Sequence, residues 1–233
     1  MKYRTIVADP PWPYRQKLGR GKSQGHLTRG GLPYRAMSLD EIERLPISEL
    51  AEDDSMLWLW TTNSHLPNAV VIMERQWGFR YITMATWGKV GREGRPQIGL
   101  GYWLRGATEH VLLGVRGNPR SRMVGPNGAT GRAWSTLLLA PRSEHSEKPQ
   151  VFYDMVEDIS EPPMLELFAR RRRLGWDVWG NEVDPTVEVF PSPARGQAGV
   201  EPAAQEQSGL GSAALASGDI DSDGFHEGTE DAQ

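Results

Sequence analysis

Short apolar runs alternate with segments of helical period along the first 183 residues of the chain. The runs are typical of buried strands and fall at 3–8, 56–61, 79–87, 109–115, 164–168 and 176–179. Between them, helices are predicted to begin near Ser38, Ser64 and Pro149. Strands alternating with helices indicate an α/β fold around a mostly parallel, doubly wound sheet. In such sheets, ligands bind at the carboxyl ends of the strands.

The pattern stops before the end of the chain. Residues 186–233 are rich in Pro, Gly, Ala, Ser, Gln and acidic residues and have no apolar period, so we expect them to be disordered. They hold nine acidic residues and one arginine, which leaves 25 basic and 21 acidic residues in the body. The sequence therefore predicts a folded domain over 1–185 and an acidic tail over 186–233. A mildly basic body suits a polyanionic ligand and is equally compatible with ordinary surface charge.

Cysteine is absent, which excludes disulfides, thiolate nucleophiles and cysteine-ligated metals. The five histidines are scattered without metal-ligand spacing, so we expect no bound metal. No apolar stretch approaches the roughly 18 residues of a membrane span, and no signal-peptide pattern precedes the first strand. These features predict a soluble, cytoplasmic protein without membrane association and leave its oligomeric state open.

The first apolar run ends at Asp9-Pro10-Pro11-Trp12, where a strand gives way to a loop. An exocyclic amine on a base is a poor nucleophile because its lone pair is delocalised into the ring. The Asp9 carboxylate and the Pro10 carbonyl suit it as acceptors for its two N–H bonds, and the prolines restrict the backbone. Trp12 offers a flat face on which an unstacked base can rest. The alternative is a strand-ending turn in which Asp9 caps and Trp12 packs in the core.

A second group of polar residues lies near the later strands. Lys148 precedes a predicted helix start, where the helix dipole disfavours a cation unless it serves an anion. Glu166 lies within the apolar strand MLELF and needs partners, such as Arg170 or the hydroxyl groups of a ligand. Asn181 and Glu182 follow the last strand. Each residue alone is more typical of a surface or an ion pair, but together they favour a ligand site.

With both groups in view, an ordered set of segments resembles the adenine-N6 methyltransferase family, which includes the catalytic subunit of the messenger-RNA N6-methyladenosine writer and many prokaryotic and phage relatives. The resemblance covers residues 3–183. The segments are ADPPW at 8–12, LPYRAMS at 32–38, LWLW at 57–60, TWGK at 86–89, GYWLRGATEHVLLGVRGNP at 101–119, SEKPQVFYDMVE at 146–157, and LELFAR with GWDVWGNE at 165–182.

The resemblance implies a Rossmann-like fold that depends on S-adenosylmethionine, with a permuted order in which the catalytic loop precedes the cofactor-binding strand. It assigns the catalytic loop to Asp9, Pro10, Pro11 and Trp12. Tyr34 is similar to the family residue that lines the acceptor pocket, and Trp103 lies where family members gate the substrate. The positions that match cofactor contacts are Lys148, Glu166, Arg170, Asn181 and Glu182.

The implied reaction is methyl transfer to the N6 amine of adenine in nucleic acid. A catalytically silent nucleic-acid-binding partner of the same fold is an alternative, although such partners typically lose the Asp or the aromatic of the loop. Methylation of the cytosine N4 amine is a closer alternative, but those enzymes usually carry Ser or Asn at the position of Asp9.

The compact chain, with no accessory domain in its sequence, favours a prokaryotic or phage enzyme and therefore DNA over RNA as the substrate. Loop cations that suit phosphate contacts are Arg15, Lys17, Arg20, Lys22, Arg29, Arg35, Arg92, Arg95, Arg120 and Arg122. Solvated surface charge is the ordinary interpretation for any one of them.

Overall fold

The computed structural model describes residues 1–13, 36–91, 93–99, 101, 103–128, 133–142 and 147–189. The strands are β1 (Tyr3–Ala8), β2 (Ala51–Thr61), β3 (Arg80–Lys89), β4 (Thr108–Arg116), β5 (Leu137–Ala140), β6 (Met164–Leu167) and β7 (Trp176–Trp179). The helices are α1 (Leu39–Glu43), α2 (Ile47–Leu50), α3 (Leu66–Val71) and α4 (Gln150–Ile159), and a π-helical turn, η1 (Ile72–Gln76), continues α3.

The described residues belong to one compact unit, Met1–Ser192. It includes residues 186–189, where the Thr186 N–H donates to the Val178 carbonyl and Val189 is buried. The predicted tail beyond 189 and the loop that contains Tyr34 lie outside the described residues. No helix in the described ranges is long and apolar enough to cross a membrane.

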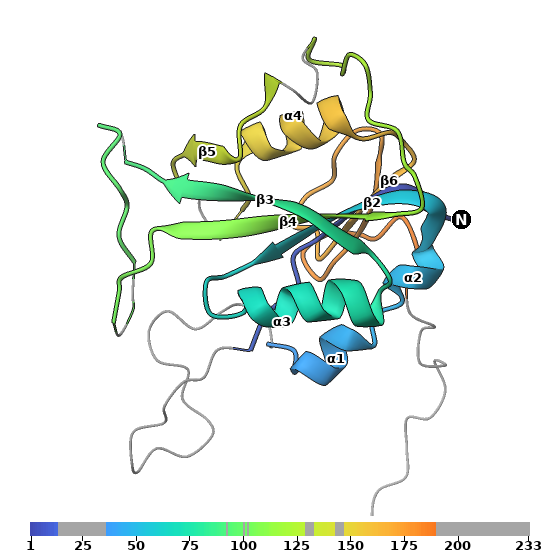
Figure 1. Cartoon of the computed structure of the whole chain (residues 1–233), viewed down its shortest axis with the longest axis horizontal. Helices are drawn as coiled ribbons and strands as arrows, with labels where there is room; N and C mark the ends of the chain where they lie inside the picture. The colour runs from blue at the N-terminus through green and yellow to red at the C-terminus, as the bar shows by residue number, and fades with distance from the viewer. Residues whose placement is uncertain are drawn as a thin grey trace, which may run out of the picture. The chain divides into compact units, whose positions relative to one another are not determined.

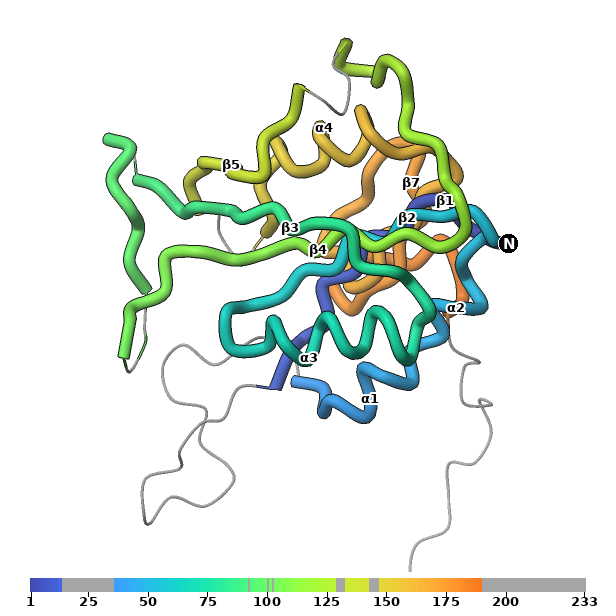
Figure 2. The backbone as a smooth tube through the Cα atoms, viewed as in Figure 1, coloured from blue at the N-terminus to red at the C-terminus, as the bar shows by residue number. Residues whose placement is uncertain are grey.

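All the described strands form one sheet in the order β5-β3-β4-β2-β1-β6-β7 (Figure 1; Figure 2). Neighbours pair in parallel except around β4, which is antiparallel to both β2 and β3. β3 and β4 are consecutive and join as a hairpin, which requires antiparallel pairing. The predicted mostly parallel α/β sheet is therefore confirmed. Because β4 is reversed, its first residues lie at the edge where the parallel strands end.

Helices cover both faces of the sheet: α1 and α3 lie on one face and α4 on the other (Figure 1). Successive strand residues point to opposite faces. In β2, Leu57 and Leu59 therefore join the core beneath α1 and α3, whereas Trp58 and Trp60 join a second core that contains Phe152 of α4. This two-sided burial explains why β2 reads as a continuous apolar run.

The edge strand β5 is missing from the sequence prediction. Within it, Leu138 and Ala140 are buried while Leu137 and Leu139 are exposed, and it pairs with β3. Four residues that alternate in this way, three of them leucine, give no distinct strand signal. Pairing with the neighbouring strand, rather than local pattern, makes this segment a strand.

The helix starts follow the sequence in one case and differ in another. Ser38 caps α1 as predicted: Ser38 Oγ accepts from the Glu41 N–H at 3.2 Å, and the Glu41 carboxylate accepts from the Ser38 N–H at 2.7 Å. The N-cap of α3 is His65 rather than the predicted Ser64. The His65 ring packs instead against the loop that follows β1.

Asp158 of α4 binds the connection between β4 and β5 through hydrogen bonds. Its side chain is fully buried and accepts hydrogen bonds from the Asn127 backbone N–H at 2.9 Å and from Trp134 Nε1 at 3.1 Å. Gly125 packs so closely that a Cβ there would lie 2.1 Å from the Asp158 Cα. One buried carboxylate thus holds Asn127 and Trp134 of this connection against α4.

Replacing Asp158 by alanine is expected to lower the free energy of unfolding by about 2–4 kcal/mol, because two donors lose their buried acceptor. Urea unfolding measures this difference. Asp154→Ala is the matched control, since the Asp154 carboxylate accepts from the Gln150 side chain at the exposed surface of the same helix. Equal losses in the two variants would contradict the fastening role.

Candidate active site

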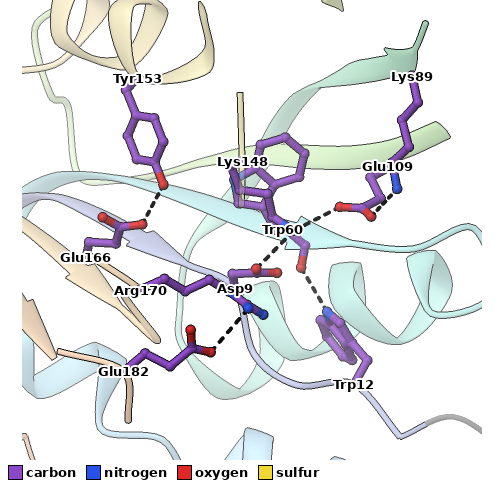
Figure 3. Close-up of polar contacts among 10 residues, drawn as sticks. All are labelled: Asp9, Trp12, Trp60, Lys89, Glu109, Lys148, Tyr153, Glu166, Arg170 and Glu182. Carbon is purple, nitrogen blue, oxygen red and sulfur yellow. Dashed lines mark hydrogen bonds and ion pairs between the residues drawn. The ribbon is translucent and has the colours of Figure 1, made fainter. Parts of the chain in front are cut away.

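Asp9 directly follows β1, at the edge of the sheet where β1, β2 and β6 end. Its Oδ2 lies 2.9 Å from Lys148 Nζ, and the same Nζ lies 2.8 Å from Glu109 Oε2. Glu109, near the start of the reversed β4, also pairs with Lys89 at the end of β3. Four charges of alternating sign therefore run along this edge, in the order Asp9, Lys148, Glu109 and Lys89 (Figure 3).

Lys148 is the central cation of this row. It is 9% exposed, and its Nζ lies 4.7 Å from the centre of the Trp60 ring. Its position before α4 is unfavourable for a cation because the helix dipole is positive there. The carboxylates of Asp9 and Glu109 offset this cost, so the charge of Lys148 is explained by its neighbours on β1 and β4.

The row has a definite protonation pattern. Burial would lower the pKa of Lys148, but the carboxylates of Asp9 and Glu109 raise it above its ordinary value. Burial would raise the pKa of Glu109, but Lys148 and Lys89 together bring it to about 2. Burial raises the pKa of Asp9, with Lys148 opposing the rise. Asp9 is consequently the carboxylate in the row that takes up a proton most readily.

Trp12 anchors the loop after β1 in the core. Its side chain is 3% exposed, and its Nε1 donates to the Trp60 carbonyl at 2.9 Å (Figure 3). The Trp12 ring stacks on the His65 ring, with 5.4 Å between centroids and 15° between planes. The packing of Trp12 matches the strand-ending turn that the sequence left open as an alternative. Its role as a platform for a base stays a prediction.

The two prolines hold the loop through their carbonyls. The Pro10 carbonyl accepts from the Trp12 N–H at 2.8 Å, and the Pro11 carbonyl accepts from the Met37 N–H at 2.9 Å. Beyond Trp12, His65 Nε2 lies 2.9 Å from the Pro13 carbonyl oxygen. The backbone after Asp9 is therefore fixed at successive residues, which orients the Asp9 carboxylate. A carbonyl oxygen has two lone pairs, so Pro10 retains one for a further donor.

A pocket opens beside Asp9, at the carboxyl ends of β1 and β6. Glu166 of β6 is 8% exposed in it and accepts a hydrogen bond from the Tyr153 hydroxyl at 2.6 Å. Arg170, which also lines the pocket, pairs with Glu182 at 3.2 Å. Charged groups of both signs line this hollow, whose residues are Asp9, Glu147, Lys148, Tyr153, Glu166, Phe168, Arg170 and Arg171.

The amino-acid sequence is similar to those of known proteins. Residues 3–182 match the MT-A70 family. The chain belongs to the MT-A70 family. This membership confirms the predicted fold and the predicted enzyme class, an adenine-N6 methyltransferase.

Among the similar proteins is the type II methyltransferase M.MunI of Mycoplasma sp., 34% identical over 81% of this chain and 81% of its own length. A probable N(6)-adenosine-methyltransferase MT-A70-like protein of Oryza sativa subsp. japonica is 31% identical over 78% of this chain. The N(6)-adenosine-methyltransferase catalytic subunit METTL3 of Homo sapiens is 29% identical over 78%. The match spans 23% of the rice protein and 28% of the human protein.

The structure gathers most of the predicted MT-A70 site residues at one edge. Asp9, Lys148, Glu166 and Arg170 line the pocket, and Glu182 reaches it through its ion pair. Asn181 is exposed beside Glu182, whereas Trp103 is 98% exposed on the β3–β4 connection. Tyr34 lies outside the described residues. No group of three or more potential metal ligands occurs in the described part of the chain.

Among the residues of this candidate site that sequence reasoning missed are Glu109, Tyr153 and His65. Glu109 looked like the ordinary polar start of the strand EHVLLGV, because the reversal of β4 was not predicted. Tyr153 occupies a core-facing position of α4, so nothing separated it from packing residues. Arg170, suggested as one possible partner of Glu166, pairs with Glu182, and the hydroxyl of Tyr153 donates to Glu166.

Gly180 permits the close approach of the two segments that carry Arg170 and Glu182. A Cβ at Gly180 would lie 2.2 Å from the Ala169 carbonyl oxygen, and the Ala169 N–H donates to the Trp179 carbonyl at 3.0 Å. The absence of a side chain therefore brings the chain after β7 against the chain after β6.

Gly180→Ala is expected to destabilise the fold by about 1–3 kcal/mol, because backbone atoms must move to admit the methyl group. Gly91→Ala is the control, since the nearest atom to a Cβ there is the Arg95 carbonyl oxygen at 3.8 Å. Urea unfolding compares the two variants. Unchanged stability of Gly180→Ala would show that the segments are not in tight contact.

Proposed function

We propose that this chain transfers a methyl group from S-adenosylmethionine to the N6 amine of adenine in nucleic acid, with DNA as the favoured polymer. The observation that carries the proposal is the position of Asp9. Its carboxylate lines the Glu166 pocket, on a loop fixed by its own backbone hydrogen bonds. An acceptor held rigidly in a pocket of mixed charge suits an amine that must be oriented toward a bound donor.

The pocket residues fit S-adenosylmethionine. Glu166 is a buried carboxylate with one oxygen bonded to Tyr153, which leaves the other for the hydroxyl groups of a ribose. Lys148, Arg170 and Arg171 provide positive charge for an amino-acid carboxylate, and Glu147 provides negative charge for an ammonium group. When bound, S-adenosylmethionine supplies an electrophilic methyl group on a sulfonium. Asn181 and Glu182 are proposed as further contacts to it.

The protein's own residues hold the acceptor. The Asp9 carboxylate and the free lone pair of the Pro10 carbonyl accept the two N–H bonds of the adenine amine, which draws its lone pair out of the ring. Pro11 and Trp12 keep these acceptors in place. Tyr34 and Trp103 are proposed to contact the adenine or its flanking nucleotides. Solvent takes the proton that the methylated amine loses.

DNA is favoured because M.MunI, a relative whose length this chain nearly matches, is a type II methyltransferase. The relatives named as adenosine methyltransferases are much longer than this chain. An inactive partner is disfavoured because Asp9 is both present and held in the pocket. Cytosine-N4 transfer is disfavoured because a carboxylate, rather than a hydroxyl or an amide, occupies the position of the acceptor.

The test is incubation of the full chain with isotope-labelled S-adenosylmethionine and matched double-stranded DNA, single-stranded DNA and RNA, followed by nucleoside mass spectrometry. The expected product is N6-methyladenine, formed most rapidly in DNA. N4-methylcytosine would reject the adenine assignment, faster labelling of RNA would reject the DNA assignment, and the absence of label from all three polymers would support the inactive partner.

A further inference from the structure

Arg173 contacts α4 at Tyr153, a residue that lines the Glu166 pocket. Its guanidinium carbon is 3.6 Å from the centre of the Tyr153 ring. Its two terminal nitrogens donate to Gln150 Oε1 at 3.3 and 3.4 Å. Gln150 and Tyr153 are three residues apart and so lie on the same side of the helix. The cation is therefore held flat on the face of one particular tyrosine.

That tyrosine is the hydrogen-bond partner of Glu166. Its hydroxyl donates to Glu166 Oε1 at 2.6 Å, a short bond of the charge-assisted kind (Figure 3). The Tyr153 ring also makes T-shaped contacts with the rings of Phe152 and Trp176. Arg173 and these two rings thus fix the direction of the hydroxyl, and the hydroxyl fixes the direction of the carboxylate.

A carboxylate as deeply buried as Glu166 requires such support to remain ionised. Burial raises the pKa of Glu166, and the Tyr153 hydrogen bond and the positive charge of Arg173 oppose the rise. Of the other charged groups that line the pocket, Asp9 adds to the rise and Arg171 opposes it. Arg171 is half-exposed and paired with Glu147, so its contribution is screened. Arg173 is the better placed cation.

We propose that Arg173 is a positioning residue for the cofactor site: through Tyr153, it holds Glu166 as an ionised, oriented acceptor for the vicinal hydroxyl groups of a nucleoside. This inference rests on the proposed function, because it assigns the ribose of the cofactor to Glu166. Arg173 itself is behind the tyrosine ring and does not line the pocket. Its effect should therefore depend on Tyr153 and on the ribose hydroxyls of the ligand.

The experiment measures binding of S-adenosylhomocysteine to the full chain by calorimetry between pH 5 and pH 8. Arg173→Gln is expected to weaken binding about tenfold at pH 7, the loss typical of one charge-assisted hydrogen bond. Arg173→Lys retains the charge and should bind more tightly than Arg173→Gln. Arg172→Gln is the matched control, since Arg172 is exposed and donates to the Asp184 carbonyl; its affinity should stay within twofold of the wild type.

Two readouts separate positioning from a merely structural role. Glu166 must be ionised to accept, so binding weakens as the pH falls through its pKa. Removing Arg173 raises that pKa further, and the acid-side loss should therefore begin at a higher pH in Arg173→Gln. In addition, the losses in Arg173→Gln and Tyr153→Phe should not multiply in the double variant, because both act on one hydrogen bond. With 2′-deoxy-S-adenosylhomocysteine, the effect of Arg173→Gln should shrink.

Each outcome decides one question. If the wild-type chain does not bind S-adenosylhomocysteine, the proposed function fails before Arg173 is tested. If it binds and Arg173→Gln matches it within twofold with an unchanged pH profile, the positioning role is overturned. The role is also overturned if Arg173→Gln binds weakly but its acid-side loss begins at the wild-type pH, its loss multiplies with that of Tyr153→Phe, and the loss is the same with the 2′-deoxy ligand.

Discussion

Replacing Asp9 by alanine or asparagine is expected to reduce methyl transfer by at least about 10²- to 10³-fold, the usual cost of removing one preorganised group that stabilises the transition state. Asparagine preserves the shape of the side chain but is neutral and presents one acceptor oxygen where the carboxylate has two. It also loses the ion pair with Lys148. The measurement is single-turnover transfer of labelled methyl groups to an adenine-containing duplex.

Cofactor affinity should change little in the same variants, within about threefold, because Lys148 remains paired with Glu109. Asp53→Asn is the matched control, since Asp53 is an exposed aspartate at the opposite end of β2. Turnover near the wild-type rate in Asp9→Ala would remove Asp9 from the mechanism. Loss of both binding and turnover would make it a cofactor residue instead.

The pH dependence of the wild-type rate tests the same residue. Asp9 must be ionised to accept from the amine, and burial raises its pKa. The rate should therefore fall on the acid side at a higher pH than an ordinary aspartate would produce, and it should be flat well above that point. An acid limb at the ordinary aspartate pKa would contradict the desolvated setting described for Asp9.

Replacing Lys148 by methionine is expected to lower both the stability of the fold and the rate of methyl transfer. It leaves Asp9 and Glu109 facing each other, with Lys89 as the cation nearest to Glu109. Breaking an ion pair in so shielded a position should cost about 2–4 kcal/mol of stability. Methyl transfer should fall by at least about 10²-fold, because Asp9 loses the charge that keeps it ionised and the pocket loses its central cation.

Urea unfolding at several pH values provides the decisive comparison. The lowered pKa of Glu109, about 2, means that its pairing stabilises the fold above the ordinary glutamate pKa and that this stabilisation disappears as the pH falls toward 2. The stability gap between the wild type and Lys148→Met should therefore be full at neutral pH and should narrow on acidification. A gap that is independent of pH would show that Lys148 stabilises by packing alone.

Lys148→Arg distinguishes charge from geometry. Arginine restores the positive charge but not the compact ammonium group that contacts both carboxylates, so most of the stability should return while most of the activity should not. Full recovery of activity would mean that the row requires only a cation.

Much of the fold could be predicted from the sequence because local chemistry and tertiary environment agree. The run Tyr3–Ala8 is buried on both faces of the sheet, and the prolines after it prevent further strand, so its end was evident. The capping box at Ser38 and Glu41 is likewise a local signal that the structure confirms. β5 was not predictable, because only pairing with β3 makes Leu137–Ala140 a strand.

The candidate site was likewise only partly predictable from the sequence. Residue types and order along the chain predicted Asp9, Lys148, Glu166 and Arg170 as candidate site residues, and these four line one pocket. The signals were a loop after a first strand and polar groups next to apolar strands, which can be recognised in one dimension. Their partners could not be identified. Glu109 reaches Lys148 only because β4 runs against its neighbours, and Tyr153 reaches Glu166 only because α4 packs over β6.

The sequence by itself thus determined the chemical groups of this protein and the strand ends that carry them, because hydrophobic period, proline and capping act within a few residues. The tertiary structure alone decided which charges meet. Ion pairs and hydrogen bonds depend on distances of about 3 Å between segments far apart in the chain, and those distances are set by strand direction and helix packing.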